Sequence, residues 1–149
     1  MRAVVQRVTQ ASVSIEGRET GRIGEGVVLL VGVASGDSES EARWLADKVA
    51  NLRIFKDEDG KMNRSLLEIG GQALVISQFT LYGDARKGRR PSFVHAAQGP
   101  DAVARYEGVI EALEAAGVAC ESGEFGAMMD VALVNSGPVT ILLDSEKTF

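Results

Sequence analysis

The chain has 149 residues, a formal net charge of −5 and a hydrophobic share of 45%. This length suits a single domain, residues 1–149, that buries a core without disulfides or metals. One cysteine excludes an internal disulfide framework, and an acidic chain is not expected to coat nucleic acid indiscriminately. The opening residues lack a signal-peptide pattern, and no apolar run approaches the roughly 20 residues of a membrane helix. We therefore expect a cytoplasmic protein that does not contact a membrane.

Strand patterns outnumber helix patterns along the chain. Stretches rich in β-branched or continuously apolar residues predict strands within residues 2–8, 11–17, 27–33, 73–78, 118–136 and 138–144. The stretch 27–33 is apolar on both faces, which is typical of a buried central strand. A short strand followed by a turn is expected within 53–63.

Two long helices are predicted, over residues 38–52 and 99–118. Ser38 and Glu41 form a capping-box pattern at the start of the first helix. Apolar residues at helical spacing define one face of each helix: Ala42, Leu45, Val49 and Leu52, then Val103, Tyr106, Ile110 and Leu113. Strands in the majority with two long helices indicate an α/β fold, in which the helices pack on a largely antiparallel sheet.

Several common catalytic patterns are missing. One Cys and one His cannot build a Cys/His zinc site, and neither a P-loop nor a G-x-S-x-G elbow occurs. His95 has no acidic neighbour in the sequence to orient it, and Cys120 is more typical of a small core residue than of a nucleophile. The run DEDG, residues 57–60, predicts a polar turn rather than a calcium loop.

Two stretches combine polar groups with a strand end. SQFTLYGD (residues 77–84) follows a buried strand, so hydroxyls, an amide and free backbone N–H groups converge where an oxygen-rich substrate needs them. NSGPVT (residues 135–140) places Gly137-Pro138 inside a run that otherwise alternates as a strand, although proline cannot donate to a sheet ladder. An ordinary strand exit and a tight turn are the alternatives.

One basic run stands out in the acidic chain. Four of the 16 Lys and Arg residues fall within five positions: Arg86, Lys87, Arg89 and Arg90. Such a run binds phosphate groups without reading a base sequence, or it is simply a solvated loop.

The motifs, in their order and spacing, resemble the D-aminoacyl-tRNA deacylase family. SQFTL at 77–81 and NSGPVT at 135–140 are similar to its two signature motifs, and QRVTQASV, RIFKDEDGKMN, RRPSF and GEFGAMMDVALVN fit along the rest of the chain. The resemblance implies a homodimeric α/β fold with a barrel-like sheet. It also implies hydrolysis of the ester that joins a D-amino acid, and in some members glycine, to tRNA. No cofactor or metal is implied, and tRNA rather than DNA is the implied partner.

The resemblance also implies roles for individual residues. Gly137 and Pro138 correspond to a Gly-cis-Pro element that reaches into the partner subunit's pocket, binds the substrate amino group and excludes an L side chain. Arg7 corresponds to an arginine that braces this element; without the resemblance, an ordinary exposed arginine is the simpler interpretation. The family's active-site run corresponds to Ser77, Gln78, Phe79 and Thr80.

We expect the backbone N–H groups of Phe79 and Thr80 to stabilise the oxyanion while the RNA assists the attack of water. Thr80 lacks an evident base and is not expected to be the nucleophile. One departure is Ser136, where relatives usually have aspartate, and it places in doubt any role for a charge there. A non-catalytic tRNA-binding module and a hydrolase of small D-aminoacyl esters remain the alternatives.

Overall fold

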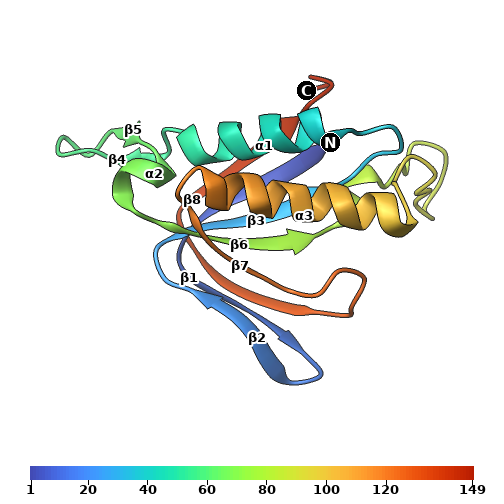
Figure 1. The fold of residues 1–149 in the computed structure, drawn as a ribbon, viewed down its shortest axis with the longest axis horizontal. Coiled ribbons are helices and arrows are strands. Elements are labelled where there is room, and N and C mark those ends of the chain that lie inside the picture. The colour runs from blue at the N-terminus through green and yellow to red at the C-terminus, as the bar shows by residue number, and fades with distance from the viewer.

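The computed structural model describes all 149 residues. Its eight strands are β1 Arg2–Ile15, β2 Arg18–Ile23, β3 Gly26–Gly32, β4 Phe55–Lys56, β5 Met62–Arg64, β6 Gln72–Ser77, β7 Ala119–Ser122 and β8 Asp130–Asp144. Its helices are α1 Glu39–Asn51, α2 Leu66–Ile69 and α3 Gly99–Ala115, together with the 3₁₀ turn η1 Phe79–Tyr82. The mixed α/β class and the two long helices are therefore as predicted (Figure 1).

Six strands form one curved sheet in the order β2-β1-β3-β6-β7, with β8 paired to the other edge of β1. The prediction of a largely antiparallel sheet holds around β1, which is antiparallel to β2, β3 and β8. It is wrong for the centre, where β6 is parallel to both β3 and β7. The reason is that α1 and α3 lie in the connections β3–β6 and β6–β7, and a helical crossover returns the chain in the same direction.

The sheet closes almost into a barrel. A Cβ atom added at Gly21 in β2 would lie 3.1 Å from the carbonyl oxygen of Ser122 in β7, so the two ends of the sheet approach closely. A side chain at this position would have to push the neighbouring backbone away by a few tenths of an ångström, which favours glycine. The expected barrel-like shape is therefore present.

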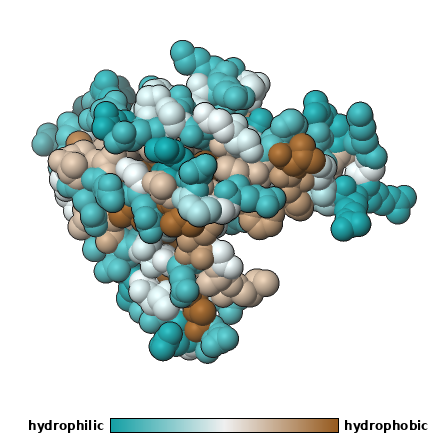
Figure 2. Space-filling view, turned by 45° about the vertical axis from the view of Figure 1, so that its right-hand side comes forward, coloured by the Kyte–Doolittle hydropathy of each residue, from teal (hydrophilic) through white to brown (hydrophobic).

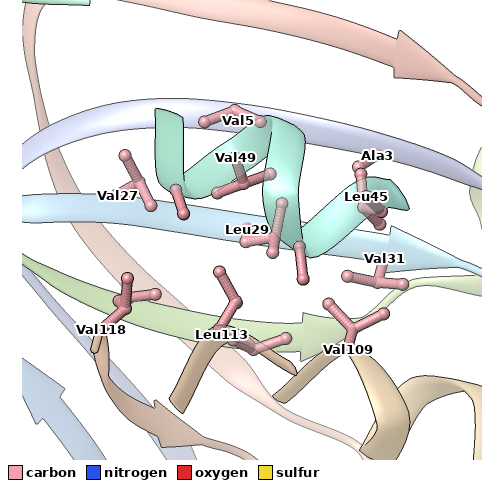
Figure 3. Close-up of a cluster of buried hydrophobic side chains, with 14 of the residues drawn as sticks. Ala3, Val5, Val27, Leu29, Val31, Leu45, Val49, Val109, Leu113 and Val118 are labelled. Atoms are coloured by element: carbon pink, nitrogen blue, oxygen red, sulfur yellow. The ribbon is translucent and has the colours of Figure 1, made fainter. Parts of the chain in front are cut away.

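The main core lies between the sheet and the two long helices, which run side by side across one face (Figure 1). Figure 3 shows Val27, Leu29 and Val31 of β3 pointing toward Leu45 and Val49 of α1. Val109 and Leu113 of α3 close the same cluster. Outside the core, hydrophobic atoms appear as separate patches on a mainly hydrophilic face (Figure 2). None of the helices is long and apolar enough to span a bilayer.

The predicted start of helix α1 is confirmed, whereas the predicted buried face of helix α3 is only partly correct. Ser38 caps α1, and both hydrogen bonds of the predicted capping box with Glu41 are present. In α3, however, Ala102 and Val109 are buried, while the predicted Val103 and Ile110 are only partly buried. Because α3 carries apolar residues on two adjacent faces, the packing partners rather than the pattern decide which one is enclosed.

The strands also differ in extent from the prediction. The predicted stretch 2–8 and residues 11–15 of the stretch 11–17 form the single strand β1, whereas residues 16–17 form a turn. This strand bends from the main core into a second cluster around Val13 and Ile23. The two predicted C-terminal strands become β7 and a β8 that continues through Gly137-Pro138. The short helix α2 has no counterpart among the predictions.

Candidate active site

The SQFTL run forms the end of β6 and the turn that follows it. Ser77 is paired with Val31 of β3, and the N–H of Gln78 donates to the Val31 carbonyl at 2.7 Å. The first hydrogen bond of the η1 turn runs from the Leu81 N–H to the Gln78 carbonyl, at 3.2 Å. Phe79 and Thr80 precede that donor, so the turn itself offers their N–H groups no partner. Two adjacent backbone N–H donors therefore lie just beyond the C-terminal end of β6.

The side chains of this run hold one another in place. The Gln78 side-chain amide donates a short hydrogen bond to the Thr80 hydroxyl. Phe79 is 56% exposed, and its ring packs edge to face on Phe93 with the ring centres 5.0 Å apart. This contact joins the run to the long loop between η1 and α3.

A cleft of about 330 Å³ opens beside this run. Ser77, Gln78 and Phe79 form one side, and the segment Phe125–Met129 between β7 and β8 forms the other. Most of its lining is apolar, and Met128 is 90% exposed at its rim. Apolar walls around a few convergent polar groups are typical of a small-molecule site. Phe125–Met129 belongs to a motif noted in the sequence, but no pattern marked it as part of the site.

The Gly137-Pro138 element leaves the sheet ladder. Asn135 is opposite Val8 and Thr140 is opposite Gln6, so residues 136–139 of β8 stand against one residue of β1. The Gly137–Pro138 peptide bond is cis, as the resemblance implies. Both Gly137 and Pro138 are exposed. The proline therefore needs no ladder partner, because this part of the strand bulges outward.

The side chain of Asn135 closes the base of this bulge. Its Oδ1 accepts a hydrogen bond from the Val139 N–H at 2.8 Å, and its Nδ2 donates to the Thr140 hydroxyl at 3.1 Å. No sequence pattern singled out Asn135, because an asparagine beside Gly-Pro is ordinary turn chemistry.

Arg7 lies beneath the bulge and is only 7% exposed. Its Nε donates to the Ser136 carbonyl at 2.9 Å, and its Nη1 donates to the Ile54 carbonyl at 2.6 Å. The interpretation of an ordinary exposed arginine is therefore wrong. The bond to Ser136 uses the backbone, so this contact does not require the aspartate that relatives have at that position.

The two motifs lie at opposite ends of β3. Ser77 is beside Val31, whereas Arg7 is opposite Val27. Four residues along a strand span about 13 Å. The cleft that Ser77 lines does not include the bulge, and Arg7 and Ser136 line a separate polar pocket.

The basic run lies on the loop between η1 and α3. Paired backbone hydrogen bonds between Asp84 and Ser92, at 2.8 and 2.9 Å, close the base of this loop. All four basic side chains are exposed, and Arg86 makes an ion pair with Asp84 at 2.6 Å that holds the pKa of that carboxyl below its usual range. Because Phe93 packs on Phe79, the loop that carries this run adjoins the cleft.

The other candidate groups play no evident part in this cleft. Cys120 is partly buried, and burial raises the pKa of its thiol to about 12, which disfavours the thiolate. His95 is exposed on the basic loop. Asp57 accepts hydrogen bonds from the N–H groups of Asp59 and Lys61, so DEDG forms a polar turn as predicted.

Comparisons with known proteins identify the family of this chain. Residues 4–144 match the family model described as D-Tyr-tRNA(Tyr) deacylase. A protein from Roseiflexus castenholzii, named D-aminoacyl-tRNA deacylase, is 60% identical over 97% of this chain and 92% of its own length. A protein of the same name from Bacillus velezensis is 57% identical over 99% of this chain and all of its own length.

Two solved structures share the fold. One, described as a c-Myc DNA unwinding element binding protein, superposes with a TM-score of 0.92 at 39% identity, over 97% of this chain and 99% of the other. Another, described as a probable eukaryotic D-amino acid tRNA deacylase, gives a TM-score of 0.80 at 19% identity, over 95% of this chain and 97% of the other. At that lower identity, only the fold is shared.

The fold and the matched family place the chain among the deacylases that act on aminoacyl-tRNA. It belongs to the D-Tyr-tRNA(Tyr) deacylase family. The resemblance stated from the sequence motifs is thus confirmed, and with it the expectation of an enzyme rather than a non-catalytic module.

Proposed function

We propose that the protein hydrolyses the ester bond of D-aminoacyl-tRNA, which releases free tRNA and the D-amino acid, and that glycine mischarged on tRNA is a second substrate. The observation that carries this proposal is the pair of backbone donors at Phe79 and Thr80 beside a small apolar cleft. An ester carbonyl presented there gains hydrogen bonds as its oxygen becomes an oxyanion.

The proposed mechanism assigns the chemistry to the backbone and to the RNA. Losing one oxyanion donor typically raises a barrier by about 2.7–4 kcal/mol, so two donors supply a substantial part of the rate. The Thr80 hydroxyl accepts its hydrogen bond from an amide, and an amide cannot remove the hydroxyl proton. A water molecule assisted by the terminal ribose hydroxyl therefore serves as the nucleophile, with no cofactor.

The proposed chiral filter is the bulge at Gly137 and Pro138. Arg7 from below and Asn135 at its base hold it in one shape, so it excludes an L side chain by its position. Because the bulge is at the far end of β3 from its own cleft, it serves the cleft of a second copy.

The exposed edge of β8 supports the homodimer that this arrangement requires. This strand has 15 residues and pairs only with β1, and Val134 and Leu142 on it are 48% and 57% exposed. A long apolar edge strand is normally covered, because its unpaired N–H and C=O groups otherwise invite aggregation.

One assay with matched substrates tests the proposal. D- and L-aminoacyl-tRNA carrying the same amino acid are offered together with a D-substrate whose terminal 2′-hydroxyl is removed, and ester loss is measured. Rapid loss of the D-ester, slow loss of the L-ester and a strong requirement for the 2′-hydroxyl are expected.

Each element of the proposal has an outcome that opposes it. Binding without turnover supports a non-catalytic module, and equal cleavage of D- and L-esters removes the chiral filter. Undiminished turnover without the 2′-hydroxyl defeats the assistance by RNA. A glycyl-tRNA arm tests the second substrate, and duplex DNA added as a competitor is expected to leave turnover unchanged.

A further inference from the structure

A second cleft, of about 680 Å³, lies next to the proposed active site and has no role in the reaction described above. Its lining comes from three parts of the chain that are distant in sequence: Arg2 of β1, the loop after η1, and the C-terminal residues. The lining includes Arg2, Tyr82, Arg86, Val94 and Phe149.

The two clefts are connected through the η1 turn and the loop that follows it. Tyr82 is the last residue of the η1 turn that begins with the oxyanion donor Phe79. Phe93 packs on Phe79, and Val94, the next residue along the chain, lines the second cleft. A polymer whose end occupies the first cleft therefore reaches the second one directly.

The surfaces of the second cleft suit unpaired bases. Phe149 is 64% exposed, so its ring is available for stacking, and Val94, 73% exposed, adds apolar contact surface. The Arg2 guanidinium lies 4.7 Å from the centre of the Tyr82 ring and 5.8 Å from that of Phe149, so it lies within cation–π range of both rings.

The basic residues that would face a phosphate backbone lie on the loop beside the cleft, whereas the lining itself also holds the acids Asp84 and Glu146. Arg86 is oriented by its two hydrogen bonds to the Asp84 carboxylate, at 2.9 and 2.6 Å, and it neutralises that acid. The unpaired positive charge comes from Lys87, Arg89 and Arg90, which follow on the same exposed loop. Stacking surfaces beside a positively charged path are the usual way in which proteins hold single-stranded nucleic acid.

We infer that this cleft binds the unpaired nucleotides that precede the terminal adenosine of the tRNA substrate. The inference rests on the proposed function and adds a subsite to it. These nucleotides are single-stranded, so their bases are free to stack on Phe149 while their phosphates face the basic loop.

Substrates of increasing length test this subsite. Single-turnover hydrolysis is compared for a D-aminoacyl-adenosine and for the same amino acid on a CCA trinucleotide. The wild type should cleave the trinucleotide at least about fivefold more efficiently, since stacking of one base contributes roughly that much or more. Phe149→Ala should lose this gain and leave cleavage of the adenosine ester unchanged, and Phe149→Tyr should restore the gain.

Met62→Ala is the matched control, because Met62 is 56% exposed on β5 and does not line the cleft. Equal efficiency of the wild type on both substrates, or an equal loss on both in Phe149→Ala, overturns the inference. Failure of the wild type on full-length D-aminoacyl-tRNA instead overturns the proposed function, so the two failures are distinguishable.

Discussion

Gly137 is the residue at which the geometry of the bulge tolerates least change. A Cβ atom there would lie 2.8 Å from Cγ2 of Val139 and 2.9 Å from Nη2 of Arg7. Its φ of +137° is also rare for any residue with a side chain. Glycine is therefore required both by backbone conformation and by contact with the buried arginine.

Gly137→Ala should displace Arg7 from the Ser136 carbonyl and distort the proposed filter. We expect hydrolysis of D-aminoacyl-tRNA to fall at least tenfold, or the preference for D over L to collapse, in a comparison of kcat/KM for the two esters. Gly60→Ala is the control, since Gly60 has a φ of +76° but no neighbour within 4 Å. Unchanged kinetics in Gly137→Ala would contradict the proposed role of the bulge.

Substitution of Thr80 tests whether its hydroxyl acts as the nucleophile. If its backbone N–H rather than its hydroxyl takes part, Thr80→Ala should retain turnover within about threefold of the wild type, because alanine keeps the N–H. Removal of a true nucleophile costs about six orders of magnitude in a well-studied hydrolase. Single-turnover rates on D-aminoacyl-tRNA decide the matter, and a loss greater than a thousandfold would restore Thr80 as a nucleophile.

Among the elements, α1 has the clearest pH-dependent contact. Hydrogen bonds from the Ser38 hydroxyl and N–H lower the pKa of Glu41 from its ordinary 4.5 to about 2. A carboxyl whose pKa is lower in the folded state stabilises the fold above its unfolded pKa. That contribution is lost as the pH falls from about 5 through 2.

Glu41→Gln should therefore reduce the decline in the free energy of unfolding between pH 5 and pH 2. Urea unfolding at a series of pH values measures this decline. Glu39→Gln, which changes the same charge on the same helix, is the control and should alter the decline less. Identical pH profiles for the wild type and Glu41→Gln would show that the capping box contributes nothing to acid stability.

The loop between η1 and α3 is the element expected to contact tRNA phosphates. Neutralising its four basic residues should weaken tRNA binding and flatten the salt dependence, with the slope of log K against log salt falling by roughly 2 to 3. Titrations at several salt concentrations measure this slope. The control removes four exposed positive charges elsewhere: Arg18, Arg22, Arg43 and Lys48. An unchanged slope would exclude the loop from the tRNA interface.

At the scale of the whole molecule, the two halves of the proposed site are separated within one chain. The proposed oxyanion donors lie at one end of β3 and the bulge lies at the other. Val134→Lys combined with Leu142→Lys should place charges on the exposed edge strand, yield monomers in sedimentation, and abolish most of the deacylase activity. A fully active monomer would contradict the shared site.

The sequence by itself determined the local features of this protein. The capping box of α1, the alternation and runs of the main strands, and the polar turn at Asp57 depend on neighbours within a few residues. The motif pair that indicates the family depends on residue identity and order alone. Each of these features could therefore be predicted from the sequence alone.

Only the tertiary structure decided the features that depend on distant neighbours. Packing selected Ala102 and Val109 for the buried face of α3, and the helical crossovers made the centre of the sheet parallel. Burial of Arg7 under the bulge required β1 and β8 to pair on both sides of that bulge. The physical reason is that burial and strand direction are set by contacts between segments far apart in the chain, which local periodicity does not encode.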